Sequence, residues 1–388
     1  MDIYLDNAAT TRPLDSVIDR VARVMKDTYG NPSSLHKKGI EAEKILKQAK
    51  ELFAKHLGAF EEEIYFTSGG TESNNTAILG GAYAYQRNGK KIITSAIEHA
   101  SVKDVFSYLE NNGFEIVVIP VNKEGYINEE ILYDQIDKHT ILVSIMHVNN
   151  EIGTVQDIEK IGYNIKDRNS KTIFHVDAVQ SFSKIPIHVK RAKIDLLSLS
   201  GHKFYGPKGI GILYKNKDVL MKSLIHGGGQ QKNIRSGTEN VPAIAGMAEA
   251  CDYVFTHFNE LTHHYRACKD YFIHHLFHEI EDLHINGPKS AEGAPHIVNI
   301  GFKDIKAEVL LHALEHNNIY VSSGSACSSN KAHELGVLEA IGNKGDDRDN
   351  ALRFSFGIDI TEQDLNTVID VINKQIVLLR KFKEGGRK

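Results

Sequence analysis

The feature that most constrains the fold is a series of short apolar runs separated by helical patterns. The runs cover residues 63–67, 91–95, 115–121, 141–148, 172–177, 194–199 and 210–214. Several are apolar at successive positions, as expected for strands that are buried on both faces of a parallel sheet. Helical patterns follow Thr71, His99 and Asp157, and the stretch 41–57 has an apolar face with Lys and Glu opposite. Alternating strands and helices predict an α/β fold with a large, doubly wound, mostly parallel sheet.

The pattern changes after about residue 257. A long polar helix is followed by a strand at 297–302, a helix at 307–317, strands near 319–322 and 351–356, and a final helix from 362. The chain of 388 residues is also longer than one typical domain. We therefore expect a large α/β domain over residues 15–257 and a smaller α+β domain over 258–388, with residues 1–14 packed on the smaller one.

Charge and cysteine content argue against several classes of protein. The chain has 46 basic and 50 acidic residues, a net charge of −4 without a strongly basic stripe, so direct nucleic-acid binding is not expected. No apolar run is long enough to cross a bilayer, and the first residues, MDIYLDNAATT, lack the apolar core of a signal peptide. The three cysteines, Cys251, Cys268 and Cys327, are far apart, which argues against a disulfide framework. We expect a cytoplasmic protein with reduced thiols and no membrane contact.

Three segments at the ends of expected strands have the residue types of a ligand site. The glycine-containing turn 68–73 (SGGTES) precedes a helix and could bind an anion or be only a tight turn. Asp177 ends a buried strand, where it could pair with a cationic ring nitrogen or cap the next helix. Lys203 follows another strand in SGHKFYGPKG, a setting that favours a desolvated amine able to form a Schiff base over a surface lysine.

An ordered set of motifs extends over nearly the whole chain. The set is DNAATT (6–11), GNPSS (30–34), TSGGTESN (67–74), EHAS (98–101), NNEIG (149–153), HVDAVQS (175–181), SGHKFYGPKG (200–209), RSGTEN (235–240), SSGSACS (322–328) and RFS (353–355). With this set the chain resembles cysteine desulfurases of the NifS/IscS type, in the class V aminotransferase family of fold-type I pyridoxal-phosphate enzymes. The resemblance implies a homodimer that converts L-cysteine to L-alanine and keeps the sulfur as an enzyme persulfide.

The resemblance also implies roles for the matching residues. Lys203 is implied to carry pyridoxal phosphate as a Schiff base, Asp177 to pair with the pyridinium nitrogen, and His99 to stack on the ring and move a proton. Residues implied to complete the cofactor site are Gly70, Thr71, Asn150, Gln180, Ser200 and His202, with Thr238 reaching the phosphate from the neighbouring subunit. Arg353 is implied to bind the substrate carboxylate, with Asn31 and Asn150 assisting. Gly70 departs from the alanine that the resemblance leads us to expect.

The resemblance implies that Cys327 distinguishes desulfurases from class V aminotransferases. Its surroundings, SSGSACSSNKAHELG, are small and polar, which favours a loop. This loop resembles that of desulfurases whose cysteine delivers sulfur to another protein, such as an iron–sulfur scaffold or a tRNA-thiolating enzyme. Cys251 and Cys268 lie in helical patterns, where a packed thiol is the expected state.

Other functions share part of this pattern. A class V aminotransferase would share Lys203, Asp177 and Arg353 without needing the loop cysteine, and a selenocysteine lyase would share Cys327 as well. Outside enzymes, the alternative is a sulfur-relay protein without catalysis, which the intact Lys203, Asp177 and His99 disfavour. No metal site is expected, because the histidines of the polar helix have no carboxylate or cysteine that completes a ligand set.

Overall fold

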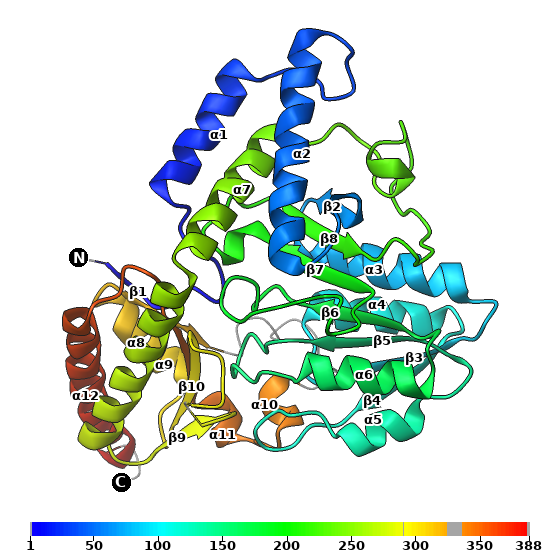
Figure 1. Ribbon diagram of the computed structural model, residues 1–388. Helices are drawn as coiled ribbons and strands as arrows, with labels where there is room; N and C mark the ends of the chain where they lie inside the picture. The colour runs from blue at the N-terminus through cyan, green and yellow to red at the C-terminus, as the bar shows by residue number, and fades with distance from the viewer. Residues whose placement is uncertain (1, 290, 324–335, 386–388) are drawn as a thin grey trace.

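The computed structural model describes residues 2–289, 291–323 and 336–385. Its largest element is a seven-stranded sheet with the strand order β2-β8-β7-β6-β5-β3-β4 (Figure 1). The strands are β2 (Ile64–Thr67), β3 (Lys91–Ser95), β4 (Glu115–Ile119), β5 (Thr140–Met146), β6 (Ile173–Asp177), β7 (Leu196–Ser200) and β8 (Gly211–Lys215). Neighbouring strands are parallel except for the two pairs that β8 makes. The predicted mostly parallel sheet is confirmed.

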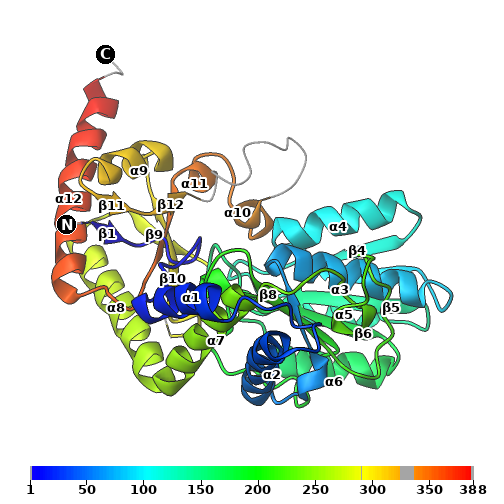
Figure 2. The same ribbon diagram turned by 90° about the horizontal axis from the view of Figure 1, so that it is seen from above.

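Helices cover both faces of this sheet, as Figure 2 shows. They are α1 (Asp15–Asp27), α2 (Lys37–Leu57), α3 (Gly70–Tyr85), α4 (Ala100–Asn111), α5 (Glu129–Gln135), α6 (Ile158–Arg168) and α7 (Val241–Thr256). Successive strand residues alternate between the faces: Leu142 packs in the apolar cluster with α3 and α4, while Val143 packs in the cluster with α2, α6 and α7. Burial on both faces explains why these strands are continuously apolar in sequence.

The remainder of the chain forms a second apolar core around a smaller sheet, β12-β13-β10-β9. Its strands are β9 (Leu283–Asn286), β10 (Ile297–Phe302), β12 (Ser322–Ser323) and β13 (Ala351–Ser355), and its helices are α8 (Phe258–Glu279), α9 (Ala307–Glu315) and α12 (Glu362–Gly385). The short helix α11 (Asp346–Asp349) precedes β13, and α10 (Val337–Ala340) packs in a separate small cluster with Ile97, Met146 and Ile152. The N-terminal strand β1 (Ile3–Tyr4) pairs with β11 (Ile319–Tyr320), and Ile3 and Leu5 lie in this core. The domain boundaries at 15–257 and 258–388 stay a prediction.

The structure refines several of the predicted elements. The strand expected near 319–322 is divided into β11, which pairs with β1, and β12, which pairs with β13. The strand expected at 115–121 ends at Ile119 and lies at the edge of the large sheet, so several of its side chains are exposed. Strand β9 was not predicted, because its four residues, Leu-His-Ile-Asn, are too few to show a clear period. Within the described residues, no helix has both the length and the apolar composition needed to span a bilayer.

Candidate active site

Three predicted residues follow strands of the large sheet at the same edge. Asp177 is the last residue of β6, Lys203 lies in the short 3₁₀ helix that follows β7, and His99 precedes α4 in the connection after β3. Strands β3, β5, β6 and β7 are parallel, so their carboxyl ends meet at one edge. This edge is where open α/β sheets bind ligands.

Asp177 is buried and held by two hydrogen bonds. Its Oδ2 accepts from Asn74 Nδ2 on α3 at 2.7 Å, and its Oδ1 accepts from the Val179 N–H at 2.9 Å. The hydrogen bond from Val179 caps the turn that follows β6. The prediction that Asp177 acts as a cap therefore holds for Oδ1 alone. Asn74 was not singled out from the sequence, although it lies in the TSGGTESN motif.

His99 caps helix α4 with its ring. Nδ1 accepts from the Ser101 backbone N–H at 3.1 Å, which leaves the ring proton on Nε2. The pKa of His99 is lowered, chiefly because the protein around it excludes water; Asp177 opposes this effect and Lys203 adds to it. The residue nevertheless keeps an exposed surface, so it is a neutral imidazole that a ligand can reach.

Lys203 points at the N-terminal segment of the chain. Its Nζ donates to the carbonyls of Ala8 and Ala9, at 2.7 Å each, and Gln180 Nε2 donates to the Ala8 carbonyl at 2.8 Å. Behind the site, Lys184 Nζ donates to the Lys203 carbonyl at 2.7 Å. Burial, with a contribution from Lys203, lowers the pKa of Lys184 to about 7. The backbone that carries Lys203 is therefore held from the interior side as well.

A pocket of about 400 Å³ opens beside Lys203. Its lining consists of Ala9, Thr10, Ser68, Gly69, Gly70, Thr71, Glu72, Ser200, His202, Lys208 and Gly209. The sixteen-residue helix α3 begins at Gly70 and presents its N-terminal end to this pocket. Hydroxyl groups, glycine backbone and a helix N-terminus suit a phosphate monoester.

Neighbouring residues restrict the space at Gly70 and the protonation of His202, two residues of the pocket lining. A Cβ at Gly70 would lie 2.8 Å from Cγ2 of Val179, which explains a glycine where the resemblance led us to expect alanine. His202 Nδ1 lies 3.1 Å from Thr10 Oγ1, and burial, together with Lys203 and Lys208, lowers the pKa of His202 to about 4. His202 is therefore neutral at pH 7 and can offer a single N–H to an anion.

Arg353 lies on β13 at the border between the two cores. Its Nη2 donates to Asp6 Oδ1 at 2.7 Å and its Nη1 to the Asn150 carbonyl at 2.9 Å. The arginine side chain is 9% exposed, and its Nε has no partner among the described residues. The structure thus brings Arg353 and Asn150 together, and adds Asp6, which the sequence analysis did not single out.

The structure does not bring Thr238 and Asn31 to this site within one chain. Thr238 is exposed and does not line the pocket. Asn31 lies in the loop that joins α1 to α2, and its Oδ1 accepts from the Ser33 N–H at 2.9 Å. Figure 1 shows this loop at the top of the molecule. Cys327 lies outside the described residues. The roles of these three residues stay predictions.

Metal binding has no support in the part of the chain that the structure describes. No group of three His, Cys, Asp or Glu side chains there is arranged to hold an ion. The histidines of α8 that the sequence analysis weighed include His264, whose Nε2 lies 3.3 Å from the Gly357 carbonyl.

The architecture is that of a fold-type I pyridoxal-phosphate-dependent transferase, in which a lysine and an aspartate follow neighbouring strands of a mostly parallel sheet. The family model for the class V aminotransferases matches residues 3–368. The chain belongs to this family.

Comparisons with known proteins give the same result. The chain is 42% identical to cysteine desulfurase IscS of Dictyoglomus turgidum over 379 residues, which cover 98% of this chain and 95% of that protein. It is 46% identical to a NifS/IcsS protein homolog of Lactobacillus delbrueckii subsp. bulgaricus over 355 residues, which cover 91% and 92%.

Solved structures agree. A NifS-like protein matches with a TM-score of 0.92 and 36% identity, covering 97% of this chain and all of that one. A structure described as SspA in complex with cysteine matches with a TM-score of 0.79 and 34% identity, covering 91% and 98%. The predicted family and fold class are confirmed.

Proposed function

We propose that this protein is a pyridoxal-phosphate-dependent cysteine desulfurase, which converts L-cysteine to L-alanine and receives the sulfur on Cys327 as a persulfide. The observation that carries the proposal is the placement of Lys203 and Asp177 on neighbouring strand ends beside an anion pocket. Membership of the class V family and relatives named cysteine desulfurase support it. L-cysteine as substrate is further supported by the similar structure in complex with cysteine.

The site residues fit pyridoxal phosphate. Lys203 would carry the aldehyde carbon, Asp177 would face the ring nitrogen, and Gly70, Thr71, Ser200 and His202 would hold the phosphate, with Asn150 and Gln180 beside the ring. When bound, the cofactor supplies an electron-withdrawing ring that stabilises negative charge on the substrate α-carbon. Asp177 supports this chemistry because a buried carboxylate favours a protonated ring nitrogen.

Side chains of this protein would bind the substrate and transfer its protons. Arg353 would bind the substrate carboxylate with N–H groups that Asp6 and Asn150 leave free. The Lys203 amine would take the α-proton, while the Ala8 and Ala9 carbonyls hold its Nζ in place. His99 is neutral at pH 7, so it can exchange a proton with the substrate thiol through Nε2.

Sulfur transfer needs a nucleophile that is not one of these groups. The Cys327 thiolate would attack the substrate sulfur, forming an S–S bond while the bond between Cβ and sulfur breaks. The bonding electrons stay with carbon, which takes up a proton, so the products are L-alanine and the Cys327 persulfide. No external oxidant or reductant is required.

Partners and location follow as part of the same proposal. The persulfide would pass to an acceptor protein, such as an iron–sulfur cluster scaffold or a tRNA-thiolating enzyme. The resemblance carries the proposal of a homodimer, in which Thr238, exposed within one chain, would complete the neighbour's phosphate site. A cytoplasmic location is proposed because a persulfide carrier needs reducing surroundings.

The test compares cysteine variants. The assay contains a dithiol reductant, which releases sulfide from a persulfide. Cys327→Ser should bind the cofactor and L-cysteine but release no sulfide and carry no persulfide, since a hydroxyl is too weakly ionised to attack sulfur. Cys251→Ser is the control, because Cys251 is buried in α7 and burial raises the pKa of its thiol well above the ordinary value. The readouts are persulfide labelling by mass spectrometry and alanine production. A Cys327→Ser variant that forms sulfide and alanine like the wild type would refute the assignment of Cys327 as the sulfur acceptor, whereas sulfide formed with pyruvate in place of alanine would indicate a β-lyase.

A further inference from the structure

Glu72 places a carboxylate on the wall of the proposed phosphate pocket. It follows Thr71 in the first turn of α3 and belongs to the pocket lining. Its side chain is only 14% exposed. A carboxylate close to a phosphate monoester repels it, and partial burial strengthens the repulsion because less water screens the charges. The pocket therefore needs a positive charge that compensates Glu72.

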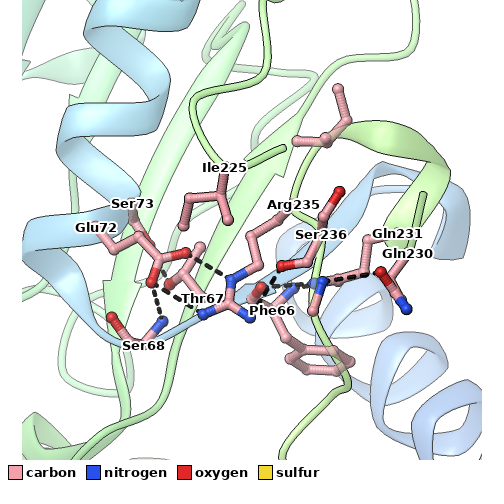
Figure 3. A network of polar contacts seen from close by, with 12 residues as sticks. Phe66, Thr67, Ser68, Glu72, Ser73, Ile225, Gln230, Gln231, Arg235 and Ser236 are labelled. Carbon is pink, nitrogen blue, oxygen red and sulfur yellow. Dashed lines mark hydrogen bonds and ion pairs between the residues drawn. The ribbon is translucent and has the colours of Figure 1, made fainter. Parts of the chain in front are cut away.

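Arg235 supplies that charge from a distant part of the chain. Its Nε donates to Glu72 Oε1 at 2.9 Å and its Nη2 to Oε2 at 3.4 Å, as Figure 3 shows. The Ser68 N–H donates to Oε2 at 2.9 Å. Burial raises the pKa of Glu72, but the hydrogen bonds from Arg235 and Ser68 outweigh it, so the pKa is lowered. Glu72 is thus ionised at neutral pH, and the guanidinium, not a proton, compensates its charge.

The segment that carries Arg235 is fixed to the edge of the large sheet. Gln231 pairs with the edge strand β2 through its side chain: Oε1 accepts from the Phe66 N–H at 2.6 Å and Nε2 donates to the Phe66 carbonyl at 2.7 Å (Figure 3). Farther along, the Gly237 N–H donates to Gln230 Oε1 at 2.8 Å. These contacts lie on either side of Arg235 in sequence, so its guanidinium is held against Glu72 by an anchored backbone.

We propose that Arg235 is a positioning residue for the cofactor phosphate: by neutralising Glu72 it allows the pocket to accept a dianion. Arg235 does not line the pocket itself, so it acts through Glu72. The inference rests on the proposed cofactor site. It concerns the affinity for pyridoxal phosphate rather than the chemistry on L-cysteine.

The experiment is a double-mutant cycle read out by cofactor affinity. Cofactor-free protein is titrated with pyridoxal phosphate, and the dissociation constant is measured from the absorbance of the bound cofactor. Arg235→Gln should weaken binding about tenfold or more, since it leaves an uncompensated carboxylate beside the phosphate. The Glu72→Gln, Arg235→Gln double variant should return to within about threefold of the wild type, because the repulsion is gone and the Gln oxygen still accepts from Ser68. Pyridoxal, which lacks the phosphate, should bind Arg235→Gln as it binds the wild type.

Arg191→Gln is the matched control. Arg191 pairs with Glu159 at 2.6 Å on the surface, with the two side chains 65% and 42% exposed, and should leave the affinity unchanged. Equal affinity of Arg235→Gln and wild type would overturn the inference, as would a double variant that stays as weak as the single one. Equal weakening for pyridoxal and pyridoxal phosphate would overturn it too, because the effect would then not act on the phosphate.

Two further measurements separate the possible failures. If Arg235→Gln does not fold, as seen by thermal unfolding, Glu72→Gln carries the test and should bind pyridoxal phosphate at least as tightly as the wild type; weaker binding would refute the role of charge. A wild-type protein that does not bind pyridoxal phosphate would instead refute the proposed function, and the inference with it.

Discussion

Replacing Asp177 with asparagine separates the two interpretations of this residue. One carboxylate oxygen caps the turn after β6 through the Val179 N–H, and the other accepts from Asn74. Asparagine keeps a side-chain oxygen for the capping contact but removes the negative charge. If Asp177 were only a cap, the variant would lose about 1 kcal/mol of stability and little activity.

The proposed function predicts a much larger effect. Two unit charges about 3 Å apart interact by roughly 5 kcal/mol at an effective dielectric constant of about 20. A hydrogen bond from the neutral amide retains about 1 kcal/mol of this. The net loss of about 4 kcal/mol, if expressed in the rate-limiting step, corresponds to roughly a thousandfold slower turnover.

Three measurements check this prediction. The rate of alanine formation should fall by about three orders of magnitude, the pH titration of the cofactor's absorbance should shift, and the thermal unfolding midpoint should change by only a few degrees. Asp157→Asn is the control, since Asp157 caps α6 by accepting from the Lys160 N–H at 3.0 Å. An Asp177→Asn enzyme within a few-fold of the wild-type rate would show that Asp177 is a cap and not a partner of the cofactor.

Further predictions concern the attachment lysine, a buried histidine and the glycine of the pocket. Lys203→Ala should lose the absorbance of bound cofactor and all alanine formation while the protein still unfolds cooperatively; a coloured, active variant would contradict the assignment. Burial lowers the pKa of His175 to about 3, so only the unfolded chain takes up its proton as the pH falls below the ordinary value of 6.5. Protonation of the unfolded chain at His175 should therefore lower the free energy of unfolding by about 2 kcal/mol between pH 7 and pH 5. Urea unfolding of His175→Asn should show about 2 kcal/mol less pH dependence than the wild type, and an unchanged pH dependence would contradict this prediction. Gly70→Ala should weaken pyridoxal phosphate binding, because its Cβ would meet Val179 at 2.8 Å, and adding Val179→Ala should restore it; a double variant as weak as the single one would contradict this contact.

The large sheet and the family could both be predicted from the amino-acid sequence. Strands β2, β3 and β5–β8 were predicted because strands buried on both faces must be continuously apolar, which is a local property of the chain. The same property placed Asp177 and Lys203 at strand ends. The family was predicted from the ordered motifs, and the comparisons confirm it.

Which polar groups meet at the site depends on the tertiary structure. Asn74 reaches Asp177 across 103 residues of sequence, Arg235 reaches Glu72 across 163, and Arg353 reaches Asp6 across 347. No local pattern encodes these pairs, because the periodicity of an element shows which face is buried but not which residue of another element lies opposite.

Burial likewise set the protonation of the site. A histidine has the same ordinary pKa wherever it stands in the sequence, yet His99 and His202 both have lowered pKa values because the folded protein excludes water from them. Desolvation depends on atoms brought together from distant segments, so it exists only once the chain is folded. The groups of the site could therefore be predicted from the sequence, whereas their charges and their partners depend on the fold.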